Sequence, residues 1–112
     1  MNKELVSQVV ARLASHGWTP IEGGTAIARK TFDTAVGPKE ALVYLTNSRD
    51  DDPNRTLQGD YQSEGRNVLE PHGVLLPKAA EPVMVDALVD KFVAGAERAV
   101  GESYAARLRN QA

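Results

Sequence analysis

The sequence contains no cysteine, only 5% aromatic residues and no marked excess of either charge. Without cysteine the chain has no disulfide, no thiolate nucleophile, no iron–sulfur cluster and no Cys-based zinc site. Thirteen Lys and Arg residues against fifteen Asp and Glu residues give a net charge of −2. This balance argues against a dedicated nucleic-acid binder, which carries a basic excess, and it is too mildly acidic for a DNA mimic.

Long hydrophobic runs are missing as well. No stretch of the sequence approaches the roughly 18 apolar residues that a membrane span requires. The first residues, Met-Asn-Lys-Glu-Leu-Val-Ser-Gln, contain no apolar core of signal-peptide length. Together with the lack of cysteine, these features predict a cytoplasmic protein without membrane association.

The start of the chain predicts a helix. Apolar residues recur there at helical spacing: Leu5, Val6, Val9, Val10 and Leu13. We place the helix at about 3–16, with Asn2 as its N-cap and Gly17 as the left-handed residue that ends it. Trp18 follows directly, and we expect it to fold back onto the core.

The next part of the chain predicts an antiparallel hairpin. A strand over 25–32 is followed by a loop over 33–39, which contains Gly-Pro, and then by the apolar run 41–45. Because that run has no polar alternation, it suggests a central strand buried on both faces. The residues 47–54 are turn formers and charges, which predicts a polar loop.

A third strand is predicted over 56–62, followed by a turn over 63–66. Two short extended pieces, 67–69 and 74–76, come next. They are either one interrupted strand or an edge strand with a loop, since Pro71 between them argues against a regular central strand.

The last third of the chain reads as a helix over 82–109, because Pro82 favours a first turn and apolar residues follow with helical period. A helix of this length would span roughly 42 Å, which is long for so small a domain. Gly95 and Gly101 weaken it, so we expect a break near Gly101 or a tail that projects and packs on a partner. A projecting tail would favour a homodimer through this helix.

These elements predict an α+β fold in a single domain over 1–112, which has enough hydrophobic residues (42%) for one modest core. An N-terminal helix, a three- to four-stranded antiparallel sheet and a long C-terminal helix form a two-layer sandwich with both helices on one face.

No residue pattern identifies a catalytic, cofactor or metal site. The triplet Asp50-Asp51-Asp52 matches no calcium-loop spacing and favours a solvated loop. His16 falls in the last turn of the first predicted helix, where a cation complements the helix dipole. His72, near Glu70, leaves open a small hydrolase-like enzyme that uses it with Glu70 or Asp60 for general acid–base work.

The stretch from Gly59 to His72 is the most unusual part of the sequence, because it concentrates directional polar side chains around one tyrosine. It predicts a partner-binding surface on a loop held by the scaffold. The candidate contact residues are Asp60, Tyr61, Glu64, Arg66, Asn67 and His72. A structural alternative stays open, in which Arg66 pairs with Asp60 or Glu64 and Asn67 satisfies the turn.

Three segments resemble small accessory proteins of plasmids and integrative conjugative elements of Proteobacteria: Gly59 to Leu69, Leu75-Leu76-Pro77 and the C-terminal Ser103 to Leu108. The resemblance covers roughly residues 55–110 and supplies no catalytic residues. It implies a protein that binds and blocks host machinery, including CRISPR–Cas and restriction systems.

The leading hypothesis is therefore a non-enzymatic protein of a mobile genetic element that binds a protein complex of the bacterial host. An anti-CRISPR or antirestriction inhibitor that occludes its partner is the specific form of this hypothesis. The small enzyme and a homodimeric structural or regulatory protein are the alternatives. Nucleic-acid binding also stays open, although the charge balance disfavours it; the basic residues for it would be Arg29, Lys30, Arg49 and Arg55.

Overall fold

The computed structural model describes residues 3–46 and 54–110, so Asn2, Arg49 and the aspartate triplet lie outside the described residues, as does most of the predicted polar loop. The helices are α1 (Lys3–Ser15), α2 (Pro82–Gly101) and α3 (Tyr104–Asn110), with a short 3-10 helix η1 (Glu70–His72). The strands are β1 (Thr19–Pro20), β2 (Ala26–Thr34), β3 (Gly37–Thr46), β4 (Arg55–Asp60), β5 (Gln62–Ser63), β6 (Arg66–Asn67) and β7 (Val74–Leu76).

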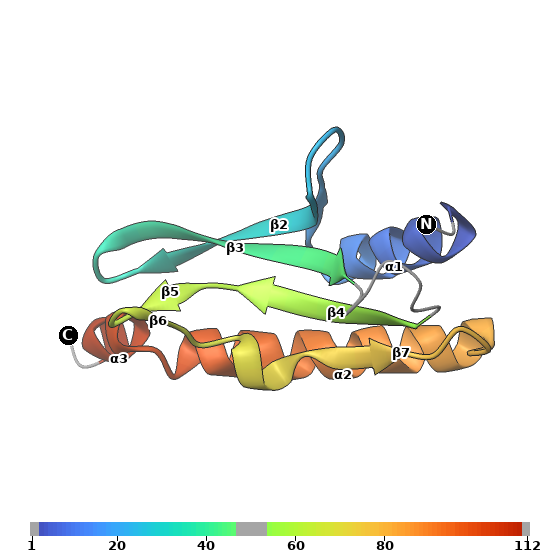
Figure 1. Cartoon of the computed structure of the whole chain (residues 1–112). Helices are drawn as coiled ribbons and strands as arrows, with labels where there is room; N and C mark the ends of the chain where they lie inside the picture. The colour runs from blue at the N-terminus through green and yellow to red at the C-terminus, as the bar shows by residue number, and fades with distance from the viewer. Residues whose placement is uncertain (1–2, 47–53, 111–112) are drawn as a thin grey trace.

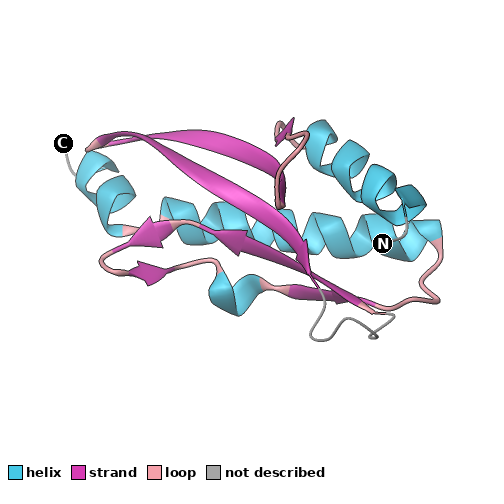
Figure 2. Ribbon diagram, turned by 45° about the horizontal axis from the view of Figure 1, so that its top comes forward, coloured by secondary structure: helices cyan, strands magenta, loops and turns pink. Residues whose placement is uncertain are grey.

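Five strands form one antiparallel sheet in the order β1-β2-β3-β4-β7, while β5 and β6 pair in a separate small hairpin. Helices α1 and α2 pack together on one side of the sheet (Figure 2). This arrangement confirms the predicted α+β sandwich. The expected three or four strands missed β1, whose two residues pair with β2 through Thr19 and Arg29.

Strand β3 is the central strand of the sheet, as predicted, but it is buried on one face only. Ala41, Val43 and Leu45 point to the buried side, whereas Leu42 and Tyr44 are half-buried on the other face. The expectation of burial on both faces was wrong because both helices cover the same side of this antiparallel sheet.

The connection between β2 and β3 is much shorter than the predicted loop over 33–39. The strands extend to Thr34 and from Gly37, so only two residues join them. Gly37 has a φ of 100°, and the Thr34 hydroxyl donates a hydrogen bond to the Gly37 carbonyl (2.6 Å). Pro38 fits a strand here because this end of β3 pairs with β2 alone, so its missing N–H faces an open edge.

The chain after β4 also differs from the prediction in detail. The third strand ends at Asp60, and β5 and β6 then form a hairpin whose turn is Glu64-Gly65. The piece 74–76 is the edge strand β7, which was one of the two alternatives. Pro71 lies in η1, outside the sheet.

Helix α2 supplies one side of the core along the length of the molecule (Figure 1). Its buried side chains face the sheet and α1; they are Val85, Val89, Phe92, Val93, Ala96 and Val100. The sheet contributes Ala28, Val43, Leu57 and Leu76 to the same core. None of the helices in the described residues combines the length and apolar character of a membrane span.

Helix α1 ends as the sequence predicted. Gly17 has a φ of 88°, the left-handed conformation expected after the helix, and Trp18 is only 2% exposed. The indole packs edge-to-face on Phe32, with 6.3 Å between ring centroids. Val9 and Leu13 are fully buried, so α1 is anchored through one apolar stripe.

Of the two alternatives for the last helix, the break near Gly101 is present, and the tail folds onto its own chain. Helix α2 ends at Gly101, and α3 turns to pack on the tip of the β2–β3 hairpin. The Ala35 N–H donates to the Ala105 carbonyl (3.4 Å), and Arg109 forms an ion pair with Asp33 (2.6 Å). The tail does not project, and the homodimer stays a prediction.

Gly59 occupies a position where the core leaves no space for a side chain. A Cβ at this residue would lie 2.7 Å from Leu69 Cδ1 and 3.1 Å from Phe92 Cζ. We expect Gly59→Ala to lower the free energy of unfolding by about 1–3 kcal/mol, measured by urea denaturation. Gly101→Ala is the matched control, because a Cβ there would meet no atom within 4 Å. Equal stability of the two variants would contradict the packing described.

Candidate functional site

A cavity of about 520 Å³ lies where the β5–β6 hairpin, η1 and the junction between α2 and α3 meet. We call it the junction cavity. Its charged and polar lining residues are Ser63, Glu64, Arg66, His72, Arg98, Glu102, Ser103, Tyr104 and Arg107. Three of the six predicted contact residues, Glu64, Arg66 and His72, therefore line one site. The other three, Asp60, Tyr61 and Asn67, do not line it.

Tyr61 belongs to the core and offers no contact surface. It is 1% exposed, its ring meets Phe32 edge-to-face, and Lys39 Nζ lies 4.8 Å from its ring centroid. A partner cannot touch this side chain without opening the core, so its expected role as a contact residue does not fit the structure. Sequence inspection missed the accessible tyrosine of this region, Tyr104, which is 48% exposed and lines the junction cavity.

Asn67 and Asp60 have local structural partners. The Asn67 side-chain oxygen accepts hydrogen bonds from the backbone N–H groups of Tyr61 (3.1 Å) and Leu69 (3.0 Å). Its amide nitrogen donates to the Gly59 carbonyl (2.8 Å), so Asn67 ties the chain segments on both sides of the hairpin together, as the structural alternative predicted. The Asp60 carboxylate accepts from the Gln62 side chain (2.7 Å).

Arg66 makes no ion pair with Asp60 or Glu64, contrary to the structural alternative. Arg98 and Arg107, which line the same cavity, also have no side-chain partner among the described residues. The remaining described arginines all have partners: Arg12 with Asp90, Arg29 with Glu40, Arg55 with the Asn54 carbonyl and Arg109 with Asp33. The unpaired guanidinium groups therefore gather at one place.

The turn of the β5–β6 hairpin places Glu64 at the rim of the cavity in an unusual backbone conformation. Glu64 has a φ of 54° and Gly65 a φ of 79°, so both turn residues are left-handed. Such a two-residue hairpin favours Asn-Gly, and a glutamate at its first position is disfavoured. The hairpin thus holds the Glu64 side chain at the rim of the cavity, although glutamate disfavours the left-handed conformation.

His72 packs closely on α2 and is not joined to a carboxylate. A Cβ on Gly95 would lie 2.8 Å from His72 Nδ1, so the glycine permits this close approach. In the part of the chain that the structure describes, no hydrogen bond or ion pair links the imidazole to Glu70 or Asp60. The pair required by the hydrolase-like alternative is not assembled.

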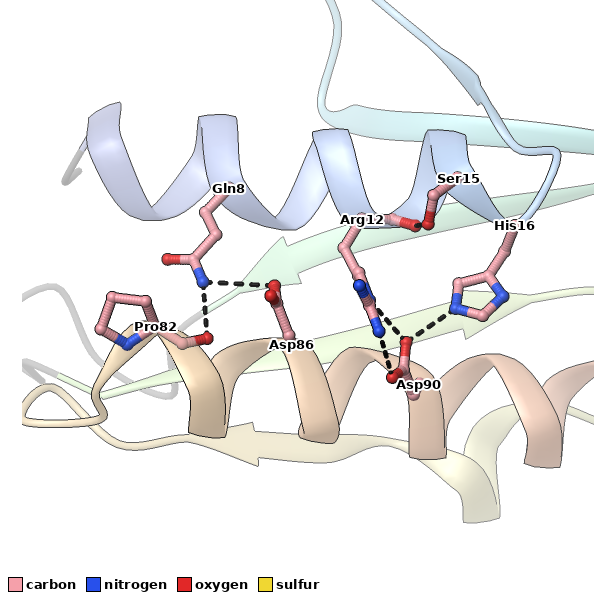
Figure 3. Close-up of polar contacts among 7 residues, drawn as sticks. All are labelled: Gln8, Arg12, Ser15, His16, Pro82, Asp86 and Asp90. Carbon is pink, nitrogen blue, oxygen red and sulfur yellow. Dashed lines mark hydrogen bonds and ion pairs between the residues drawn. The ribbon is translucent and has the colours of Figure 1, made fainter.

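A second polar cluster joins α1 to α2 (Figure 3). Arg12 donates two hydrogen bonds to Asp90, from Nε to Oδ1 (2.8 Å) and from Nη2 to Oδ2 (2.7 Å). His16 Nε2 lies 2.7 Å from the same Oδ1. One turn earlier, Gln8 Nε2 donates to the Pro82 carbonyl (2.8 Å) and to Asp86 (3.3 Å).

This cluster is a clamp between two helices. The hydrogen bond from Arg12, and next that from His16, hold the pKa of Asp90 well below its usual range. The Asp90 hydrogen bond in turn raises the pKa of Arg12. Because these three side chains satisfy one another, His16 acts through Asp90 rather than only through the dipole of α1.

Lys30 has a comparable structural role on the inner face of β2. Its ammonium group donates to Glu97 (2.5 Å) and to the His16 carbonyl (3.3 Å). Lys30 and Arg29 are thus engaged within the chain, which weakens the nucleic-acid alternative built on them. The described residues contain no group of three His, Asp or Glu side chains placed to hold a metal ion.

The clamp predicts a pH dependence of stability. Since the pKa of Asp90 is lowered in the folded state, its contribution is fully present above its unfolded pKa of about 3.9 and is lost as the pH falls below that value. We expect Asp90→Asn to lower the thermal midpoint at pH 7, and the difference from wild type to shrink in acid. Glu22→Gln is the control, because it removes an exposed carboxylate that makes no ion pair among the described residues. A difference that stays constant between pH 7 and pH 2, measured by thermal melts, would contradict the clamp.

The strained turn predicts a gain in stability on substitution. Glu64→Asn places a residue that tolerates the left-handed conformation at the first turn position, and we expect the free energy of unfolding to rise by about 0.5–1 kcal/mol. Glu64→Gln is the matched control, because it removes the same charge without relieving the backbone. Urea denaturation distinguishes the two; an equal rise in both variants would assign the effect to charge.

Comparison with known proteins identified no relative of this chain. No protein-family model, no curated protein and no solved structure matches the chain. The resemblance to accessory proteins of mobile elements stays a prediction, and the function must be argued from the junction cavity.

Proposed function

We propose that the protein is a non-enzymatic binding protein that contacts its partner through the junction cavity and its rim. The observation that carries this proposal is the set of arginines without partners, Arg66, Arg98 and Arg107, around one concave surface. Elsewhere in the described chain, arginines are paired internally. Charges left unpaired at a cavity are available to an incoming molecule.

The lining of the cavity also favours binding over nucleophilic catalysis. Ser63, Ser103 and His72 all line it, but no hydrogen bond joins either hydroxyl to the imidazole in the described residues. Nucleophilic catalysis by serine requires a base within hydrogen-bond reach of the hydroxyl. The cavity offers unpaired arginine side chains on a concave surface, and both features suit the binding of a partner.

The accessible side chains at the cavity are of the kinds that dominate protein interfaces. Arginine and tyrosine are enriched among the residues that contribute most to binding energy. Tyr104 borders Arg107, and Leu108, 37% exposed, continues the apolar part of this surface on α3. We therefore favour a protein as partner.

The resemblance to mobile-element proteins supplies the class of partner. A host defence complex of the CRISPR–Cas or restriction type would be bound and occluded by this surface. Under this proposal Glu64, Arg66 and His72 contribute to the contact, as the sequence suggested, together with Arg98, Tyr104 and Arg107 from the C-terminal helices.

Affinity capture from a nuclease-treated proteobacterial lysate that contains CRISPR–Cas and restriction enzymes tests the proposal. We expect Arg66→Ala to reduce recovery of a retained complex about tenfold, the effect of losing roughly 1.4 kcal/mol at an interface. Arg29→Ala is the control, since Arg29 pairs with Glu40 on the sheet and lies outside the cavity.

Two results would overturn the proposal. Equal recovery with Arg66→Ala and wild type would remove the cavity from the contact. Loss of every bound protein on nuclease treatment would show that the contact runs through nucleic acid.

A further inference from the structure

The junction cavity has a composition that points to the chemistry of its ligand. It collects guanidinium groups from three separate elements: Arg66 from β6, Arg98 from α2 and Arg107 from α3. The whole chain carries a net charge of −2, so this gathering of arginines does not reflect a general basic excess. A guanidinium group presents its N–H donors in a planar fork that matches the oxygens of a carboxylate or phosphate.

The two glutamates of the cavity leave the arginines unpaired. Glu102, the residue directly after α2, lies four positions beyond Arg98, and no ion pair joins the two side chains in the described residues. Glu64 is held at the hairpin turn by its left-handed backbone, and no ion pair joins it to Arg66. By formal charge, three arginines against two glutamates give the lining an excess of one positive charge.

A buried hydroxyl adds an independent observation. Ser103 lines the cavity, is 5% exposed, and its Oγ has no hydrogen-bond partner. A buried polar group without a partner is costly, and such groups in folded proteins require an explanation. A small rotation of this hydroxyl in the lining of the cavity would give an anionic ligand a neutral donor in addition to the arginines.

We infer that the junction cavity binds an oxyanion carried by the partner, a carboxylate or a phosphate group, through Arg66, Arg98 and Arg107 together with the Ser103 hydroxyl. This inference rests on the proposed function for the identity of the partner, and it specifies the group that the partner inserts. The two sources of the oxyanion are an acidic side chain and a phosphorylated one.

NMR titration of the full ¹⁵N-labelled chain tests the inference without the partner. The probes are a tetraglutamate peptide, inorganic phosphate and, as a control of opposite charge, a tetralysine peptide. We expect tetraglutamate or phosphate to shift the side-chain Nε–Hε signals of Arg66, Arg98 and Arg107 together, and to do so less at high salt. The stronger of the two probes identifies the source of the oxyanion.

Substitutions assign the response to the cavity. Arg98→Gln should weaken the response about threefold to fivefold, the size expected for one exposed ionic contact, and Arg29→Gln should leave it unchanged. Unshifted arginine signals with both anions, a stronger response to tetralysine, or a response preserved in Arg98→Gln would overturn the inference.

The outcomes separate this inference from the proposed function. A partner that is lost with Arg66→Ala, combined with no response to either anion, would keep the binding function and reject the oxyanion. A response confined to the cavity arginines, with no protein captured from lysate, would keep the oxyanion site and reject the proposed partner.

Discussion

The packing of a single long helix against one face of an open sheet is the constraint on which the rest of the structure depends. Helix α2 has 20 residues and spans about 30 Å of a molecule whose longest dimension is 47 Å. A chain of this size has one core, and α2 packs on the sheet, on α1 and on α3. Helix α1 can cover the remaining part of the core only by lying along α2, which is why the polar clamp of Asp90 joins these two helices.

The same constraint creates the junction cavity. Val100 is the last buried side chain of α2, and beyond it the helix would leave the core. The chain instead breaks after Gly101 and sends α3 across to the tip of the β2–β3 hairpin, where Ala105 is 4% exposed. A corner between two helices, closed by the β5–β6 hairpin, leaves a concave surface. The position of the cavity is thus set by where the core ends.

The sequence predicts the elements that depend on local chemistry. The stripe of α1 and the left-handed Gly17 follow from spacing and from the limits of single residues. The break near Gly101 and the edge strand after Pro71 were each one of two alternatives that the sequence left open. The sequence does not predict the short β2–β3 turn, because the Gly-Pro pair suggests a loop until the open edge of β3 is known. Burial of the central strand on one face likewise depends on which side the helices take.

The candidate site is only half predictable for a related reason. Glu64, Arg66 and His72 lie close together in sequence, so a polar stretch reveals them. Arg98 and Arg107 lie on helices about 30 to 40 residues after Arg66. Neither arginine stands out from the other residues of its own helix as a candidate for binding. Only their position on either side of the predicted helix break hints that they meet. Tyr61 shows the opposite error, because a tyrosine in a polar stretch looks exposed while the fold buries its ring against Phe32.

The distribution of ion pairs indicates how the protein would recognise an acidic group. Between α1, α2 and β2 the charges are matched within the chain, through Asp90 with Arg12 and Glu97 with Lys30. With a net charge of −2, the molecule has little long-range attraction for an anion, so electrostatic steering adds little to the rate of association. The lining of the junction cavity carries an excess of one positive charge, and at physiological ionic strength this charge acts only over about 8 Å. Affinity must therefore come from contacts made inside the cavity, and substitutions there are expected to act mainly on the rate of dissociation.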